Sequence, residues 1–342
     1  MDDAPRSRAL HRFAVATAVA TLGLIVAGGL VTSTESGLSV PDWPLSYGRL
    51  MPPMVGGVFY EHGHRMVATT VGILTVVLAV WLARKEPRRW VRRLGFLAVL
   101  AVVAQGVLGG LTVIFLLPTG VSVAHACLAQ TFLCLVVSIA VVTSPRWEPP
   151  GSDPRRGSDP APPRVPASRL AALAAAAVFV QLVIGAVMRH TKAGLAIPDF
   201  PLSFGRVVPR IDSFPVAIAF AHRSWAVVVA GFVFAAVVAA YRSGLRRSAL
   251  FLATLVPAQI ALGALTVLSR KGVAITTAHV ATGALLLSTS LALCLATGPR
   301  RSLRERRPRD FKRGLTGPRR SLRERRPEIF KRRLPPWLFG PV

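Results

Sequence analysis

The chain has 342 residues, of which 52% are hydrophobic and 17% are charged, and its formal net charge is +27. Its mean hydropathy of +0.50 is too high for a soluble globular domain, which carries more polar residues. The composition therefore excludes an ordinary soluble enzyme or binding module and favours a protein built into a membrane.

Long apolar runs follow one another along the chain as far as residue 296. Each run is close to or above the ~20 residues that a helix needs to cross a bilayer. The first follows a basic leader, as a secretory signal peptide would, but its counterpart later in the chain favours a membrane span. The sequence thus predicts an all-α membrane protein with eight transmembrane helices, at 12–32, 65–83, 94–117, 121–143, 168–188, 214–241, 248–268 and 273–296.

Basic residues collect in the N-terminal leader, in alternate connections between the spans and in the C-terminal segment. If all eight spans cross, these places lie on one side of the membrane, and the positive-inside rule puts that side in the cytoplasm. Both termini are therefore predicted to be cytoplasmic. The two long outer loops, at 33–60 and 189–213, carry few basic residues by comparison.

One nine-residue phrase occurs in both outer loops. Residues 41–49 read PDWPLSYGR and residues 198–206 read PDFPLSFGR, with seven identical positions. The phrases belong to a longer repeat, because AQGVLGGLTV (104–113) likewise matches AQIALGALTV (258–267). Each half therefore holds four spans. An even number of spans gives both halves the same orientation, so we expect two four-helix bundles related by a pseudo-twofold axis along the membrane normal.

We accordingly divide the chain into an N-terminal four-helix half (1–144), a linker (145–167), a C-terminal four-helix half (168–296) and a basic tail (297–342). The linker is rich in Pro, Gly, Ser and Arg, which is typical of a disordered cytoplasmic connector. The tail holds 16 Lys and Arg against 4 Asp and Glu. We expect it to be disordered and to lie on anionic membrane lipid, in preference to binding nucleic acid.

Four histidines stand at equivalent places in the two halves, one near the start of each even-numbered span: His64, His125, His222 and His279. Ionisable residues inside a membrane are costly and usually functional. The alternative is that each is only hydrogen-bonded to a neighbouring helix, but four at one depth near the outer side favour a shared function. The remaining His11 and His190 are expected to meet solvent.

The repeat decides between two neighbouring histidines of the second span. His222 is followed by Arg223, so its partner is His64, which Arg65 follows. His62 lies about 160° away from His64 around a helix and is given a lesser role or none. Haem is one group that membrane histidines bind, and its propionates are anionic. Arg65 and Arg223 are candidate contacts for such propionates, although interfacial snorkelling would place them equally well.

Two imidazoles from facing helices can bind a haem iron from both sides. The natural pairs are His64 with His125 and His222 with His279, which predicts two bis-histidine haem sites side by side near the outer face. Zinc or copper is the weaker alternative, because zinc sites usually add carboxylate or thiolate ligands. Only the first half offers a carboxylate nearby.

That carboxylate belongs to Glu61, which shares a helix face with His64 three residues later. The matching stretch before His222 reads AIAFA and contains no acid. A carboxyl group beside only one haem predicts one reactive site and one redox site, with Glu61 as a catalytic residue. The alternative is a purely structural role for Glu61 near the helix start.

The phrases GLSVPDWPLSYGR, EHGHR and AHACLAQ, together with GLAIPDFPLSFGR, AHR and AHVATGALLL, resemble the bacterial, CtaA-type haem A synthase family over residues 12–296. The resemblance implies an oxidoreductase of the bacterial cytoplasmic (inner) membrane that oxidises the C8 methyl of haem O to a formyl group. Its product, haem A, would serve aa3-type cytochrome oxidases.

The resemblance also implies residue roles. His222 and His279 would hold a permanent haem b as cofactor, and His64 and His125 would flank the substrate, haem O. Glu61 matches the essential glutamate, placed to accept protons as a general base. Haem O synthase and oxidase assembly factors are the implied protein partners, and a homo-oligomer stays open.

The chain also departs from the family. Many relatives carry a cysteine pair in the first outer loop, near the place of Val40, and this loop has no cysteine. We therefore expect no step that depends on a disulfide there.

Two alternatives of other classes are weaker. A di-haem b electron carrier, or quinol oxidoreductase, would usually place its haems near both membrane faces, whereas these histidines share one side. A transporter is suggested by the duplicated halves but has no evident use for four matched histidines.

Overall fold

The computed structural model describes residues 7–147 and 167–296. These residues form helices and loops, with no strand longer than an isolated bridge. The helices are α1 (Arg8–Ser33), α2 (Gly57–Lys85), α3 (Arg89–Ile114), α4 (Thr119–Val142), α5 (Ala167–His190), the short 3-10 helix η1 (Ala193–Leu195), α6 (Phe214–Arg242), α7 (Arg246–Leu268) and α8 (Val273–Ala296). The eight α-helices are each long and apolar enough to cross a membrane, as the sequence predicted.

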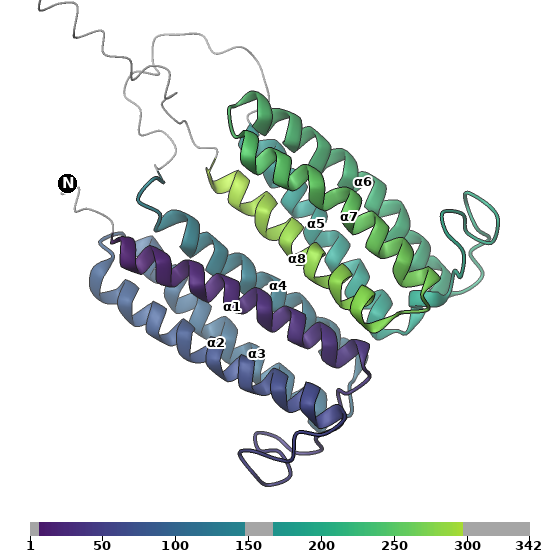
Figure 1. Cartoon of the computed structure of the whole chain (residues 1–342), viewed down its shortest axis with the longest axis horizontal. Coiled ribbons are helices and arrows are strands. Elements are labelled where there is room, and N and C mark those ends of the chain that lie inside the picture. The colour runs from purple at the N-terminus through teal and green to yellow at the C-terminus, as the bar shows by residue number, and fades with distance from the viewer. Residues whose placement is uncertain (1–6, 148–166, 297–342) are drawn as a thin grey trace, which may run out of the picture. The chain divides into compact units, whose positions relative to one another are not determined.

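The eight helices form two four-helix bundles (Figure 1). In the first, α1 packs on α2, α2 on α3, α3 on α4 and α4 on α1, and α5 to α8 repeat this cycle. The first and fourth helices of each half form the seam between the halves, through the pairs α1–α8, α4–α5 and α4–α8. Because each half has an even number of helices, α1 starts and α8 ends at the same end of the two bundles (Figure 1).

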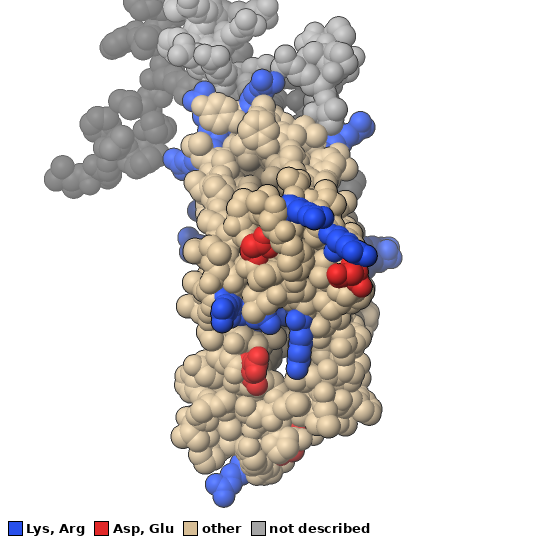
Figure 2. All heavy atoms as spheres, turned by 90° about the vertical axis from the view of Figure 1, so that its right-hand side faces the viewer, with Lys and Arg blue, Asp and Glu red and all other residues tan. Residues whose placement is uncertain are grey.

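The surface of the helices suits a lipid environment. Many large apolar side chains are exposed, among them Val19, Ile73, Phe96 and Phe234. In Figure 2 acidic and basic side chains occupy only a small part of the described surface in view. Since lipid tails are as apolar as these side chains, close packing of small residues contributes much of the stability within a bundle. The second half uses this device, with buried Ala171, Ala174, Ala177, Ala236 and Ala240 in its core.

Some helix limits differ from the predicted spans. Helix α2 begins at Gly57, whereas the apolar run begins at 65, so Glu61 and His64 lie inside the helix. The length of an apolar run reflects the thickness of the hydrocarbon layer of the bilayer. A helix can extend beyond that layer into the polar interface as long as its backbone hydrogen bonds continue. Helix α3 ends at Ile114, before the predicted 117, because Leu116 and Leu117 take positive φ values of 56° and 60°.

Much of the predicted linker and all of the tail lie outside the described residues. Of the linker, 145–147 and Ala167 are described, and Ala167 already belongs to α5. The tail at 297–342 is not described.

The repeated outer phrase folds as a tight hairpin turn in both halves. Ser46 pairs with Arg49, and Ser203 pairs with Arg206, in short antiparallel bridges. The two central residues of each turn have positive φ, which is the geometry of a type I′ turn: Tyr47 54°, Gly48 69°, Phe204 55° and Gly205 72°. Glycine accepts this conformation at no cost, whereas the aromatic residue before it needs support from elsewhere.

That support comes from one aspartate in each phrase. The carboxylate of Asp42 accepts hydrogen bonds from the backbone N–H groups of Tyr47 (2.6 Å) and Gly48 (2.8 Å). Asp199 accepts the same pair of bonds in the second phrase, at 2.8 Å each. These bonds hold the pKa of both aspartates below the usual value.

We expect the two turns to open in acid. Because the folded-state pKa of each aspartate is depressed, its contribution to turn stability is present above the ordinary aspartate pKa and is lost as pH falls through the lowered one. Hydrogen exchange of the peptide covering 40–50, corrected for the intrinsic rate, should show protection that falls only at low pH. Asp42→Asn should give lower protection that does not change with pH, and a pH response that survives this substitution would contradict the assignment.

Candidate functional site

The structure brings the predicted histidines together in two pairs, one in each half. The ring centroids of His222 and His279 lie 6.5 Å apart, with an interplanar angle of 68°. A metal bound to an imidazole nitrogen lies about 2 Å from it, so an ion held between two rings separates their centroids by roughly 6 Å. His64 and His125 lie close enough to interact electrostatically. The second pair therefore has the spacing of a bis-histidine iron site.

A glycine of the preceding helix faces each histidine ring. A Cβ atom added to the glycine would lie 3.0–3.3 Å from the ring Cε1 in all four cases: Gly28 and His64 (3.1 Å), Gly109 and His125 (3.3 Å), Gly185 and His222 (3.0 Å), and Gly263 and His279 (3.1 Å). Each imidazole thus lies directly against a helix backbone, in space that any larger residue would fill. The Nδ1 atoms of His64, His125 and His279 are buried and make no hydrogen bond within the described residues.

These features fit a haem better than a bare metal ion. Over the ranges 7–147 and 167–296, no three His, Cys, Asp or Glu side chains gather as a metal-ion site. Two facing imidazoles are sufficient for a haem iron, because the porphyrin supplies the other four ligands. The close contacts with the glycine backbones restrict how each ring can turn, which an axial ligand needs.

Glu61 is buried in α2, with 4% of its surface exposed. Its Oε1 accepts a hydrogen bond from Arg65 Nη2 at 2.7 Å, and its Oε2 accepts one from the backbone N–H of Val40 at 2.9 Å. The carboxylate therefore has a counter-charge on its own helix and a bond to the first outer loop. In the second half Ala219 takes its place and packs in a small apolar cluster with Ile197, the counterpart of Val40.

Arg65 and Arg223 tie the outer loops to the helices. The Nη1 of Arg65 donates to the carbonyl oxygens of Asp42 and Leu45, both at 2.8 Å. Arg223 donates to the carbonyl oxygens of Ile197 and Leu202, both at 2.9 Å. The role of both arginines as propionate contacts stays a prediction, and the contacts in the structure are with the loops.

His62 also holds the first loop. It is buried, and its Nδ1 lies 2.8 Å from the hydroxyl oxygen of Ser46 in the repeated phrase. The second half has Phe220 in its place, so this bond exists in one half only. The His62 side chain thus supports the loop in the half that contains Glu61.

The expectation that His11 and His190 meet solvent holds only in part, since both are half-buried. The Nδ1 of His11 lies 2.9 Å from the carbonyl oxygen of Ala140, on α4. His190 ends α5 and lies close enough to His125 of the other half to interact electrostatically. An outer-loop assignment from the sequence could not show this, because the contact depends on how the two halves meet.

Arg189 is a residue that the sequence analysis missed. From α5 its Nη2 donates to the carbonyl oxygen of Gly29 (3.1 Å) and to the hydroxyl of Ser33 (2.9 Å), both on α1. Thr277 of α8 donates to the same Ser33 hydroxyl at 3.2 Å. A cation inside a membrane helix usually has a functional or structural partner, which could have marked this residue. Its partner in the opposite half is visible only in three dimensions.

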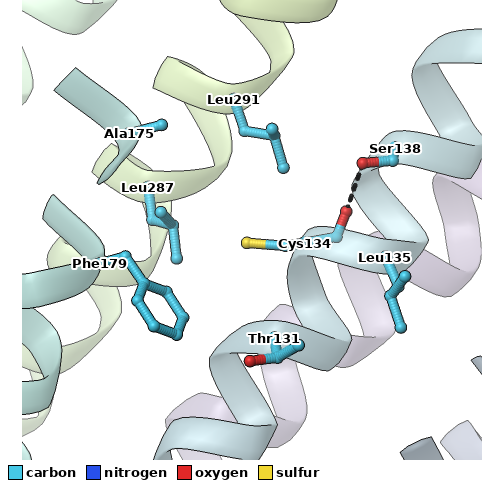
Figure 3. A pocket seen from close by; sticks show the side chains of 8 residues that line it. All are labelled: Thr131, Cys134, Leu135, Ser138, Ala175, Phe179, Leu287 and Leu291. Atoms are coloured by element: carbon cyan, nitrogen blue, oxygen red, sulfur yellow. Dashed lines mark hydrogen bonds between the residues drawn. The ribbon is translucent and has the colours of Figure 1, made fainter. Parts of the chain in front are cut away.

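A cavity of about 250 Å³ lies elsewhere, between α4, α5 and α8 (Figure 3). Its lining is mostly apolar, and the Cys134 side chain points into it. None of the predicted site residues lines this cavity, so it is separate from the two histidine pairs.

Comparison with known proteins identifies relatives of the whole helical region. The COX15-CtaA family, described as "Cytochrome oxidase assembly protein", matches residues 11–56 and 56–291. A protein named Heme A synthase from Symbiobacterium thermophilum is 34% identical over 269 residues, which is 75% of this chain and 85% of the relative. Others of the same name come from Halalkalibacterium halodurans, at 32% identity over 63% of this chain and 71% of the relative, and from Sphingopyxis alaskensis, at 29% over 88% and 96%.

Proposed function

Because the chain belongs to the COX15-CtaA family of cytochrome oxidase assembly proteins, we propose that it is a haem A synthase, which oxidises the C8 methyl of haem O to the formyl group of haem A. The eight apolar helices and the bacterial relatives make it a multi-pass protein of the cytoplasmic membrane. The observation that carries the proposal is a pair of matched bis-histidine sites of which only one has a buried carboxylate.

His222 and His279 are the proposed axial ligands of a resident haem b. Their 6.5 Å centroid separation and the glycines behind both rings support this assignment. When bound, such a haem supplies one-electron redox chemistry, and the protein sets its position and electrostatics. Arg223, the residue after His222, ties the second loop to α6, and we expect this loop to restrict water access to the pair.

His64 and His125 are the proposed positions on either side of the substrate, haem O. Glu61 is the proposed general base, because methyl oxidation must release protons and this buried carboxylate is three residues from His64. Arg65 provides its counter-charge, and the bond to Val40 fixes one carboxylate oxygen. The corresponding Ala219 can accept no proton, which suits a site that only passes electrons.

The remaining partners follow from the same proposal. Membrane lipid surrounds the helices, haem O synthase would supply the substrate, and oxidase assembly factors would receive the product. The proposed cytoplasmic placement of both ends of the helical region is supported by α1 starting and α8 ending at the same end of the two bundles (Figure 1). A homo-oligomer stays a prediction, as does the absence of a nucleic-acid partner.

The direct test is co-expression with a source of haem O, followed by haem extraction and mass analysis. We expect the purified protein to contain low-spin haem, and the extract to contain haem B together with haem A or O. A strain that lacks the protein but has the haem O source should yield no haem A. If the protein holds only haem B when haem O is supplied, the proposal is wrong and a di-haem b electron carrier becomes the better description.

A further inference from the structure

A glutamine stands one helical turn before three of the four glycines that face the histidine rings. In α3, α5 and α7 the five residues ending at the glycine begin with glutamine: QGVLG (105–109), QLVIG (181–185) and QIALG (259–263). In α1 the same five positions read LIVAG (24–28). Three of the four histidines therefore have a Gln-x-x-x-Gly segment behind them, and His64 has leucine where the others have glutamine.

The glutamines reach the helices that carry the histidines. Gln105 Nε2 donates to the backbone carbonyl of His125 at 2.9 Å, and Gln181 Nε2 donates to that of His222 at 2.9 Å. The same Gln181 nitrogen lies 3.2 Å from His222 Nδ1 and 3.3 Å from its Nε2.

The third glutamine, in α7, has a related environment. Gln259 Nε2 would lie 3.2 Å from a Cβ on Gly283, one turn after His279 on α8. Gln105 and Gln181 thus each hold the backbone at one histidine, and Gln259 lies beside the helix that carries His279.

Leu24 offers none of these contacts to His64. Its side chain is partly buried and packs against the apolar core of the first half. The Nδ1 atoms of His64, His125 and His279 alike have no hydrogen-bond partner in the part of the chain that the structure describes, so what sets His64 apart is the missing glutamine amide. A histidine that binds a metal is normally oriented by partners around it, and their loss typically costs about 10–100-fold in affinity. Of the four proposed ligands, only His64 has no glutamine at this place in the repeat.

We propose that the Gln-x-x-x-Gly segments are positioning elements that hold three axial histidines in place, and that Leu24 leaves His64 as the ligand that releases most readily. This inference rests on the proposed function, in which one haem is permanent and the other must arrive and leave. A permanent haem b benefits from two fixed ligands, His222 and His279. A substrate haem needs one fixed ligand, His125, and one that can release the iron, His64.

Gln181 and Leu24 occupy equivalent places in the repeat, so exchanging them is a matched test. The full chain, loaded with haem B and haem O, is mixed with excess apomyoglobin, and the haem left on the protein is extracted over time and identified by mass. We expect Gln181→Leu to speed the loss of haem B about 10–100-fold and to leave the loss of haem O unchanged. Leu24→Gln should slow the loss of haem O and leave haem B unchanged.

Two further measurements separate positioning from a general loss of stability. The thermal midpoint of each variant is recorded without added haem, and the low-spin spectrum with it. A purely structural glutamine would lower the midpoint and speed the loss of both haems alike, and that result would overturn the inference. If Gln181→Leu fails to fold, Gln259→Leu tests the same haem B through its other proposed ligand, His279. This variant should also speed the loss of haem B and leave the loss of haem O unchanged.

The outcome also distinguishes this inference from the function on which it rests. A wild-type protein that takes up neither haem would overturn both. A wild-type protein that holds haem B and haem O with a low-spin spectrum, but whose haem B loss is the same in Gln181→Leu and Gln259→Leu, would leave the proposed function standing and overturn the role of the glutamines.

Discussion

Replacing Glu61 with glutamine should leave haem bound but reduce the conversion of haem O to haem A by about 10²–10⁴-fold, the range that general acid–base catalysis contributes. Glutamine has nearly the same shape, and its single carbonyl oxygen can accept from Val40 or from Arg65, although not from both. It cannot take up a proton at neutral pH. Haem A yield per bound haem, measured after co-expression with a haem O source, is the quantity to compare.

The control for this prediction must loosen the first loop without removing the carboxylate. Ser46→Ala does so, because it deletes the hydroxyl that contacts His62 and keeps Glu61 intact. If Glu61 acts in proton transfer, Ser46→Ala should retain far more haem A synthesis than Glu61→Gln. Equal losses in the two variants would mean that Glu61 serves mainly to close the loop, and a wild-type yield in Glu61→Gln would remove it from the chemistry.

Gly185→Val should remove the low-spin haem of the second half. Even the first side-chain carbon at position 185 would lie 3.0 Å from Cε1 and 3.4 Å from Nδ1 of His222, closer than carbon atoms normally approach. Two further methyl groups leave the ring no place between α5 and α6, so His222 must turn away from His279. The expected result is loss of haem B from the purified protein and, since the electron route is then broken, loss of haem A synthesis.

Gly231→Ala provides the matched control, because a Cβ at position 231 of α6 meets no atom within 4 Å. This variant should keep full haem content, while Gly185→Ala should give an intermediate result with altered low-spin absorbance. Normal haem B content in Gly185→Val would show that the ring does not depend on contact with the α5 backbone.

The sequence alone predicted a large part of this molecule. Apolar run length located the eight helices, and the repeated phrases divided them into two bundles of four. The repeat also selected His64 over His62 without any structural information. The predictions of the helices and of their division into bundles succeed because membrane thickness and internal duplication leave direct, one-dimensional signals in a chain.

The contacts around the histidines could not be predicted in the same way. The segments at 104–113 and 258–267 are recognisable as a repeat from the sequence. Their amino acids alone do not indicate that Gly109 and Gly263 face imidazole rings. Likewise Arg189 looks like an ordinary basic residue at the end of a span, and only the meeting of α5 with α1 gives it partners. Such contacts depend on packing between helices that are far apart in the chain. The hydrophobic periodicity of each helix does not reveal which distant helix it packs against.

The shared placement of the four histidines has an electrical consequence. All four lie near the starts of α2, α4, α6 and α8, and these helices start at the same end of the two bundles (Figure 1). Under the proposed function, an electron that passes between the two pairs would therefore travel along the plane of the bilayer. Crossing the full bilayer changes the energy of one charge by about 2.3 kcal/mol per 100 mV, but a path within the plane crosses almost none of that field. The transmembrane voltage should thus neither drive nor oppose this transfer, and the step should run equally well in energised and de-energised membranes.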